Sequence, residues 1–248
     1  MKMHKFANIL FAGKCNAFCP DCIGKQIRQW LNKNNLTTRP LENLDRFIDI
    51  LNSEEIKEVS LTWTITDPLL YTYQKELIEC LRDNIDWVKL SLHTNGRLIK
   101  KIPDMFNAYD RAAISIPSFK EDIYSILMGT WWVPDLEYIN KISRIPLKIS
   151  TLVSDINRHD IPEFIESCYQ KWVKRLVLRK VFWDHRGLYS MIDMDSIPCI
   201  YVKDFMNNAV YDYKWMEITL REFETTENIA YNLFADGTIS DEYLLHKA

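Results

Sequence analysis

Three cysteines, Cys15, Cys19 and Cys22, lie in one short segment, KCNAFCPDCIG, directly after the apolar run 6–11. Thiolates are the usual ligands of iron–sulfur clusters, and a cubane cluster is normally held by four of them. Because this segment supplies three, one iron would keep an open coordination site for a ligand from outside the protein. The spacing therefore indicates a metal centre that can bind a further molecule.

Two other interpretations of the cysteines stay open. A structural zinc ion takes four tetrahedral ligands, and a fourth would have to come from Cys80, Cys168, Cys199 or a histidine, which the spacing does not demand. Disulfides are the other alternative, but three clustered cysteines cannot pair evenly among themselves. The N-terminal residues 1–5 lack the long apolar run of a secretory signal. In a reducing compartment, cysteines are more often metal ligands or buried thiols than members of disulfides.

The composition describes a chain with one large core. It has 248 residues, of which 47% are hydrophobic, a size at which single α/β barrels form one domain. A formal net charge of −3 argues against a nucleic-acid partner. The sequence contains no apolar run of about eighteen residues that could cross a bilayer. We expect a soluble, cytoplasmic protein without a membrane partner.

Short β-branched runs alternate with longer amphipathic stretches, as in parallel strands joined by helices. Strands are predicted at 6–11, 58–64, 88–94, 112–116, 147–153 and 175–181. Helices are predicted at 25–33, 44–52, 73–84, 98–107 and 161–172, with an interrupted helical region at 120–142. Six such units are too few to close a full eight-stranded barrel.

The spacing C-x3-C-x2-C, with Asn16 after the first cysteine and Pro20 after the second, resembles the signature of the radical S-adenosylmethionine (radical SAM) superfamily. The resemblance implies one [4Fe-4S] cluster whose open iron chelates the amino and carboxylate groups of S-adenosylmethionine. One electron then cleaves the sulfonium to give a 5′-deoxyadenosyl radical, which abstracts hydrogen from a substrate. Asp21 departs from the family, which usually has an aromatic residue before the third cysteine.

The resemblance also implies a fold, a partial (β/α)6 TIM-type barrel, and this agrees with the predicted units. Residues 1–183 are predicted to form the barrel, and residues 184–248 a C-terminal β-rich extension that caps its open side. The extension has β-prone runs at 211–223 and 231–233, and Asp236-Gly237 is typical of a hairpin turn. Loops after barrel strands converge on one face, and the cysteines follow the first strand.

The end of the second strand carries Thr66 and Asp67, where the family has a Gly-Gly-Glu-Pro segment that binds the methionyl amino group. Both glycines are absent here, and Asp67 precedes a proline as the family's glutamate does. By resemblance, Thr66 and Asp67 are predicted to contact the cofactor. Local chemistry alone gives equal weight to Asp67 as a turn residue.

The later strands supply five further candidates for the cofactor site, four of them by resemblance and Arg179 from its chemistry. Thr94 and Asn95 resemble the Thr-Asn-Gly end found in many members, and Ser115 corresponds to a serine that binds the carboxylate or ribose. Thr151 would lie along the adenine edge. Arg179 is predicted as a clamp for a carboxylate, with an exposed, solvated charge as the alternative.

The leading hypothesis is a radical SAM enzyme, an oxidoreductase or lyase, that acts on a small molecule or peptide with electrons from a donor such as flavodoxin or ferredoxin. Radical chemistry requires no Ser/His/Asp set from the protein, and no catalytic residue is predicted. A zinc-stabilised binding module is one alternative. The other is a degenerate member that keeps its cluster and serves as an electron carrier or sensor.

Overall fold

The computed structural model describes residues 4–222 and 225–245. The first six strands are β1 His4–Phe11, β2 Glu58–Trp63, β3 Lys89–Thr94, β4 Arg111–Ser115, β5 Leu147–Val153 and β6 Arg175–Lys180. The later strands are β7 Ile200–Phe205, β8 Asn208–Tyr213, β9 Met216–Arg221, β10 Asn228–Leu233 and β11 Ile239–Ser240. They form an 11-stranded sheet in the order β11-β10-β1-β2-β3-β4-β5-β6-β9-β8-β7.

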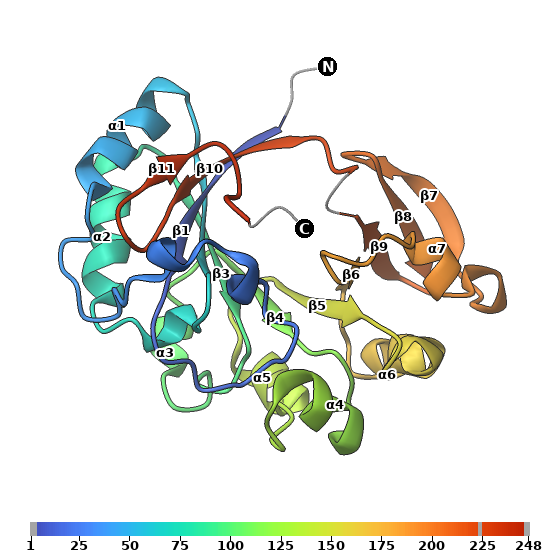
Figure 1. Ribbon diagram of the computed structural model, residues 1–248. Coiled ribbons are helices and arrows are strands. Elements are labelled where there is room, and N and C mark those ends of the chain that lie inside the picture. Colours follow the sequence, from blue (N-terminus) through green and yellow to red (C-terminus); the bar gives the residue numbers. More distant parts are fainter. Residues whose placement is uncertain (1–3, 223–224, 246–248) are drawn as a thin grey trace.

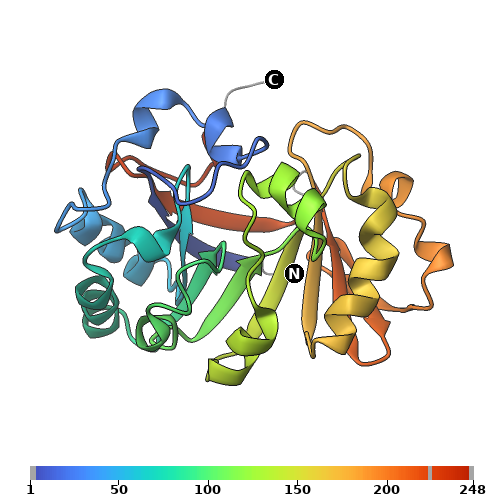
Figure 2. The same cartoon turned by 90° about the horizontal axis from the view of Figure 1, so that it is seen from below.

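All pairings from β10 through β1–β6 to β9 are parallel, and the antiparallel pairings lie at the two edges of the sheet. The sheet curves around an interior, and the helices lie outside it (Figures 1 and 2). This confirms the predicted α/β fold, and the arrangement is that of a partial barrel. No helix among the described residues has the length and apolar character needed to span a membrane.

The helices cover the outer face of the sheet. They are α1 Leu44–Ser53, α2 Gln74–Asn84, α3 Pro103–Phe106, α4 Glu121–Met128, α5 Leu136–Ile142, α6 Ile161–Gln170 and α7 Leu188–Met191. Alternate strand residues point to opposite faces, and the main core lies between the helices and the outer face. On β2 and β3 the outer face carries Val59, Leu61, Leu90 and Leu92, and the inner face carries Ser60, Thr62, Ser91 and His93. Along β2 and β3 the interior of the barrel is therefore polar.

Two predicted helices are wrong in part. Residues 25–33 form two short 3-10 turns, Ile23–Gln26 and Gln29–Asn32, because Ile27 is extended and pairs with Leu245 of the C-terminal segment. The stretch 98–107 is helical only from Pro103, since a proline is favoured in the first turn of a helix and keeps the preceding residue, Ile102, out of the helical conformation.

The C-terminal extension adds strands to both edges of the barrel sheet. The predicted run 211–223 is two strands, because Lys214 adopts a left-handed conformation with φ +63 and turns the chain between β8 and β9; Phe223 lies outside the described residues. After β9 has paired with β6, the chain crosses to pair β10 with β1 (Figure 1). The hairpin at Asp236-Gly237 joins β10 to β11, with φ +86 at Gly237.

Candidate active site

The three cysteines lie in the loop after β1, residues 12–22, which we call the cysteine loop. Parallel strands end on the same edge of a sheet, so this loop shares the barrel mouth, formed by the C-terminal ends of β1–β6, with the segments after β2 and β3. Thr64 N–H donates to Phe11 O at 2.8 Å, and Phe18 N–H donates to Met128 O at 3.0 Å. These bonds fix the loop between the end of β2 and the end of α4.

Glycines allow two close backbone approaches around the cysteine loop. A Cβ atom on Gly24 would lie 1.9 Å from Thr64 O, and one on Gly129 would lie 2.4 Å from Phe18 O. Gly129 also ends α4 with φ +62, in the left-handed region that favours glycine. A side chain at either position would push the loop away from the strand ends.

All three cysteine sulfurs are half-buried against backbone groups. Their polar neighbours are Ala17 N–H at 3.4 Å for Cys15, Met128 O at 3.8 Å for Cys19 and Thr64 O at 3.6 Å for Cys22. Across the part of the chain that the structure describes, no three His, Cys, Asp or Glu side chains converge on a point that could hold a metal ion. The thiols are neighbours in one loop rather than a closed ligand shell.

Burial raises the pKa of all three thiols, and that of Cys19 reaches about 12. Negative charge on Cys22 and Cys15 adds to the effect of burial at Cys19, so the three sulfurs lie within electrostatic reach of one another. A bound metal reverses this preference because it favours the thiolate. Three soft sulfur donors in one short loop are the donor set of an iron–sulfur cluster, and the residues fit that group.

Asp67 is buried and links two strand ends through hydrogen bonds. Its carboxylate accepts hydrogen bonds from Leu69 N–H at 2.9 Å, from Asn95 N–H at 2.6 Å, and from Thr94 Oγ1 at 2.9 and 3.0 Å. Only 2% of the residue is exposed, and burial raises the pKa of its carboxyl to about 6. The carboxylate joins the segment after β2 to the end of β3. Its role as a ligand of an amino group stays a prediction.

Asn95 and Thr66 connect these strand ends to the cysteine loop. Asn95 Nδ2 donates to Asn16 Oδ1 at 2.7 Å and lies 4.0 Å from Cys15 Sγ. Thr66 Oγ1 donates to Lys14 O at 3.4 Å. The contact between Asn16 and Asn95 was beyond sequence reasoning, because the two residues are 79 positions apart.

Comparison with known proteins decides the family. Residues 9–168, which include the cysteine loop, match the Radical SAM superfamily. The chain belongs to this superfamily. A curated relative, the GTP 3',8-cyclase of Sulfurimonas denitrificans, is 22% identical over 164 residues, which are 65% of this chain and 50% of the relative. The chain thus spans about half the length of that relative.

Solved structures share the fold of this radical SAM chain. Streptococcus suis SuiB has a TM-score of 0.64 at 12% identity, covering 97% of this chain and 61% of that chain. The enzyme anSMEcpe with bound AdoMet has a TM-score of 0.55 at 13% identity, covering 86% of this chain and 55% of that chain. At these identities the likeness shows the fold alone, and in SuiB it includes the C-terminal extension.

The other predicted contacts of the radical SAM core are divided between the two faces of the sheet. Ser115 at the end of β4 and Arg179 near the end of β6 alternate with buried outer-face residues and so lie on the inner face. Thr151 shares the outer face with Ile149, and its Oγ1 donates to Ile116 O at 2.8 Å. The structure brings Ser115 and Arg179 to the interior and leaves Thr151 on the helix-covered side.

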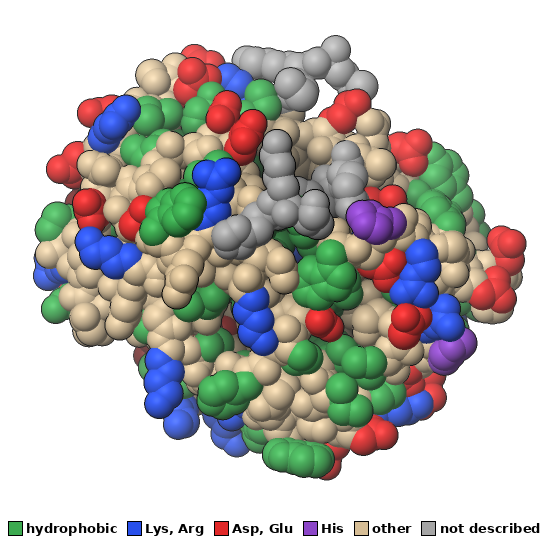
Figure 3. Space-filling model, in the orientation of Figure 1, with side chains coloured by type: hydrophobic (Ala, Val, Ile, Leu, Met, Phe, Trp, Pro, Cys, Tyr) green, Lys and Arg blue, Asp and Glu red, His purple; other side chains and the backbone are tan. Residues whose placement is uncertain are grey.

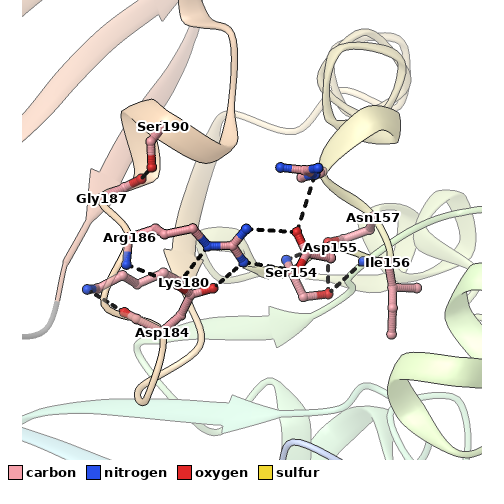
Figure 4. Close-up of polar contacts among 10 residues, drawn as sticks. Ser154, Asp155, Ile156, Asn157, Lys180, Asp184, Arg186, Gly187 and Ser190 are labelled. Carbon is pink, nitrogen blue, oxygen red and sulfur yellow. Dashed lines mark hydrogen bonds and ion pairs between the residues drawn. The ribbon is translucent and has the colours of Figure 1, made fainter.

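Arg186 joins the loops after β5 and β6 at the barrel mouth (Figure 4). Its guanidinium donates to both carboxylate oxygens of Asp155, at 2.9 and 3.1 Å, and to both of Asp184, at 2.9 and 2.6 Å. The bond to Arg186 lowers the pKa of the Asp184 carboxyl to about 2. Exposed ion pairs contribute little stability, so the main effect of this network is to fix the two loops relative to one another.

Three inner-face residues within electrostatic reach of Arg179 were not predicted from the sequence: His93, Lys148 and Arg221. The signal that could have found His93 and Lys148 is the period-two alternation of polar and apolar residues in their strands. Arg221 had no such signal, because the pairing of β9 with β6 was not predicted.

Proposed function

We propose that this chain is a radical SAM enzyme in which Cys15, Cys19 and Cys22 bind one [4Fe-4S] cluster and leave one iron open for S-adenosylmethionine. One observation carries the proposal. Three neighbouring thiols lie at the mouth of a parallel barrel, inside the segment 9–168 that matches the family.

When bound, the cluster and S-adenosylmethionine supply reductive cleavage of the sulfonium to methionine and a 5′-deoxyadenosyl radical, which takes a hydrogen atom from the substrate. The protein binds and orients the reactants. Asn95 holds Asn16 beside Cys15 and so orients the first turn of the cysteine loop. Ser115 and Arg179 line the interior near the mouth, and a guanidinium there can hold a carboxylate through two parallel hydrogen bonds.

The remaining predicted cofactor contacts, Thr66, Asp67, Thr94 and Thr151, have polar side-chain atoms that already bond protein groups. We therefore propose that these four residues support the cofactor site by fixing the strand ends. Asp67 is central to this support, because it contacts both the segment after β2 and the end of β3.

The proposed substrate is a small molecule or a peptide. Structures with this fold include SuiB bound to the precursor peptide SuiA and anSMEcpe bound to the Kp18Cys peptide, and the curated relative is a GTP 3',8-cyclase. A flavodoxin or ferredoxin would supply the electron, and placement of the substrate would decide between oxidoreductase and lyase outcomes. Free thiols favour a reducing compartment, which supports a cytoplasmic location.

The test is anaerobic reconstitution with iron and sulfide, followed by reduction in the presence of S-adenosylmethionine. We expect brown protein with about four irons per chain and formation of 5′-deoxyadenosine, measured by mass spectrometry. Changing Cys15, Cys19 and Cys22 together to alanine should remove both. Cys80→Ala is the matched control, because Cys80 is a half-buried thiol on α2, outside the cysteine loop.

Two results would contradict the proposal. Colourless protein that retains zinc after anaerobic preparation would favour the zinc-stabilised module. Brown protein that never cleaves S-adenosylmethionine would favour the electron carrier or sensor.

A further inference from the structure

Four nitrogen-bearing side chains gather on the inner face of the sheet. We call them the lumen cluster: His93 on β3, Lys148 on β5, Arg179 on β6 and Arg221 on β9. Strand register forms two pairs: His93 and Lys148 both pair with Ala113 of β4, and Arg179 pairs directly with Arg221. Arg179 is opposite Leu152, four residues along β5 from Lys148, and the long side chains of Lys148, Arg179 and Arg221 are within electrostatic reach of one another. Residues next to them in sequence, Leu92, Ile149, Leu178 and Leu220, are buried on the outer face. The cluster therefore points into the lumen of the barrel.

Among the described residues, the basic side chains of the lumen cluster have no carboxylate partner. The other basic residues of the inner face are neutralised: Arg111 pairs with Glu58 at 2.6 Å, and Arg175 pairs with Glu217 at 2.9 Å. Among the described residues, no carboxylate forms an ion pair with Lys148, Arg179 or Arg221. Arg179 Nε is buried without any hydrogen-bond partner in the described structure. Such groups are costly to bury unless something pairs with them.

The side chains of Lys148 and Arg179 are largely buried but keep some accessible surface. Burial is the first cause that lowers the pKa of Lys148, to about 7, and of Arg179, to about 9; neighbouring positive charges lower both further. Each of the two residues nevertheless keeps part of its surface accessible. Both basic side chains are therefore accessible in part to a polar ligand.

The face of the molecule drawn in Figure 3 shows no comparable concentration of one charge. On the face drawn in Figure 3, acidic and basic side chains are interspersed. The positive charge of the lumen is therefore a local feature, and a concentrated local charge of this kind raises the concentration of oppositely charged ligands.

Tyr243 connects the lumen cluster to the cysteine loop. Its hydroxyl donates to Trp63 O at the end of β2, at 3.3 Å. Burial raises the pKa of Tyr243, negative charge on Cys22 adds to the effect, and Arg179 opposes it. Tyr243 is therefore within electrostatic reach of both Cys22 and Arg179. The lumen cluster and the cysteine loop therefore both lie near Tyr243.

We propose that Lys148, Arg179 and Arg221 bind an oxyanion group of the substrate, a carboxylate or a phosphate, inside the barrel, so that Arg179 holds the substrate rather than the carboxylate of S-adenosylmethionine. Facing guanidinium groups suit such an anion because each can donate two parallel hydrogen bonds to it. The proposal rests on the proposed function and narrows its substrate class to anionic compounds. The carboxylate of S-adenosylmethionine carries one negative charge and does not by itself balance this cluster.

The test is calorimetric titration of the anaerobically purified full chain, before and after cluster loading, at an ionic strength fixed with sodium chloride. Pyrophosphate and succinate are the probes, and their relative affinities distinguish a phosphate from a carboxylate site. We expect one of them to bind. Arg221→Gln and Lys148→Met should each weaken binding about ten-fold or more, since each removes a charged hydrogen-bond donor.

Arg144→Gln is the matched control, because Arg144 is exposed before β5 and forms no side-chain ion pair in the described structure. It should bind the probes as the unaltered chain does. Thermal unfolding checks that the lumen variants fold, and we expect them to be at least as heat-stable as the parent, since each loses an unpaired charge.

Three results would overturn the proposal: no binding of either probe, equal weakening by Arg144→Gln, or a loss of S-adenosylmethionine affinity in Arg221→Gln as large as the loss for the probes. Probe binding does not require cluster loading. A chain that binds pyrophosphate but never cleaves S-adenosylmethionine would contradict the proposed function and leave the lumen site in place.

Discussion

At the scale of single residues, Asp67 corresponds to a cofactor ligand of the family, but in this structure its carboxylate holds two strand ends together. Its carboxylate has only donors around it: two backbone N–H groups and the Thr94 hydroxyl. A carboxylate has two oxygen atoms that both accept hydrogen bonds, so it can accept from all of these donors. The proline that follows it predicted a turn, but the partners from β3 are distant in sequence and were invisible without the fold.

Asp67→Asn places an amide N–H₂ against one of these donors. We expect a loss of unfolding free energy of about 1–3 kcal/mol, the cost of leaving a buried polar group unsatisfied, measured by urea denaturation. Asp86→Asn is the control, because Asp86 is exposed. Equal stability of the two variants would show that Asp67 does not hold the strand ends together.

At the scale of elements, the cysteine loop depends on backbone contacts with β2 and α4. Gly24→Ala would bring a Cβ atom to 1.9 Å from Thr64 O, so the loop must move. We expect Gly24→Ala to bind less than half as much iron per chain as the parent on reconstitution, while the far-ultraviolet circular dichroism of the barrel is retained.

Gly187→Ala is the matched control, because its Cβ would come no closer than 3.3 Å to a side-chain atom, Glu222 Oε1. Full iron loading of Gly24→Ala would contradict the role assigned to this contact.

The barrel strands could be predicted because their signals are local. Runs of β-branched residues fixed all six to within two residues of their ends, from His4–Phe11 to Arg175–Lys180. The helix predicted at 25–33 failed because a distant segment, at Leu245, pairs with Ile27 and keeps it extended. Where a tertiary contact competes with a weak local pattern, the contact decides.

At the scale of the whole molecule, the lumen cluster exists only because the order of the strands places β3, β5, β6 and β9 around one interior. Arg179 and Arg221 are opposite one another because β9 returns to the edge of β6 after the β7–β8 hairpin. No window of sequence contains that information. The cysteine spacing, by contrast, lies in one loop and identified the family before the fold was known.

The charge of the lumen should also appear in the pH dependence of stability. Lys148 lies near His93 and four arginines. Burial, with smaller contributions from Arg179, Arg221, Arg175 and Arg111, lowers the pKa of Lys148 from 10.5 to about 7. Between these pH values the unfolded chain binds a proton that the folded chain lacks, so this residue makes the unfolding free energy rise with pH. Lys148→Met should flatten the rise in urea titrations from pH 7 to pH 10. An unchanged slope would contradict the assignment.

The central claim is that three thiolates of one loop hold a cubane cluster whose fourth iron binds S-adenosylmethionine. Electron–nuclear double resonance of the reduced protein, with S-adenosylmethionine labelled by ¹⁵N in the amino group and ¹⁷O in the carboxylate, tests it most directly. We predict hyperfine coupling of both labels to the cluster, and loss of the cluster signal in the triple cysteine variant. A cluster signal without coupling to either label, or one that survives removal of all three cysteines, would contradict the claim.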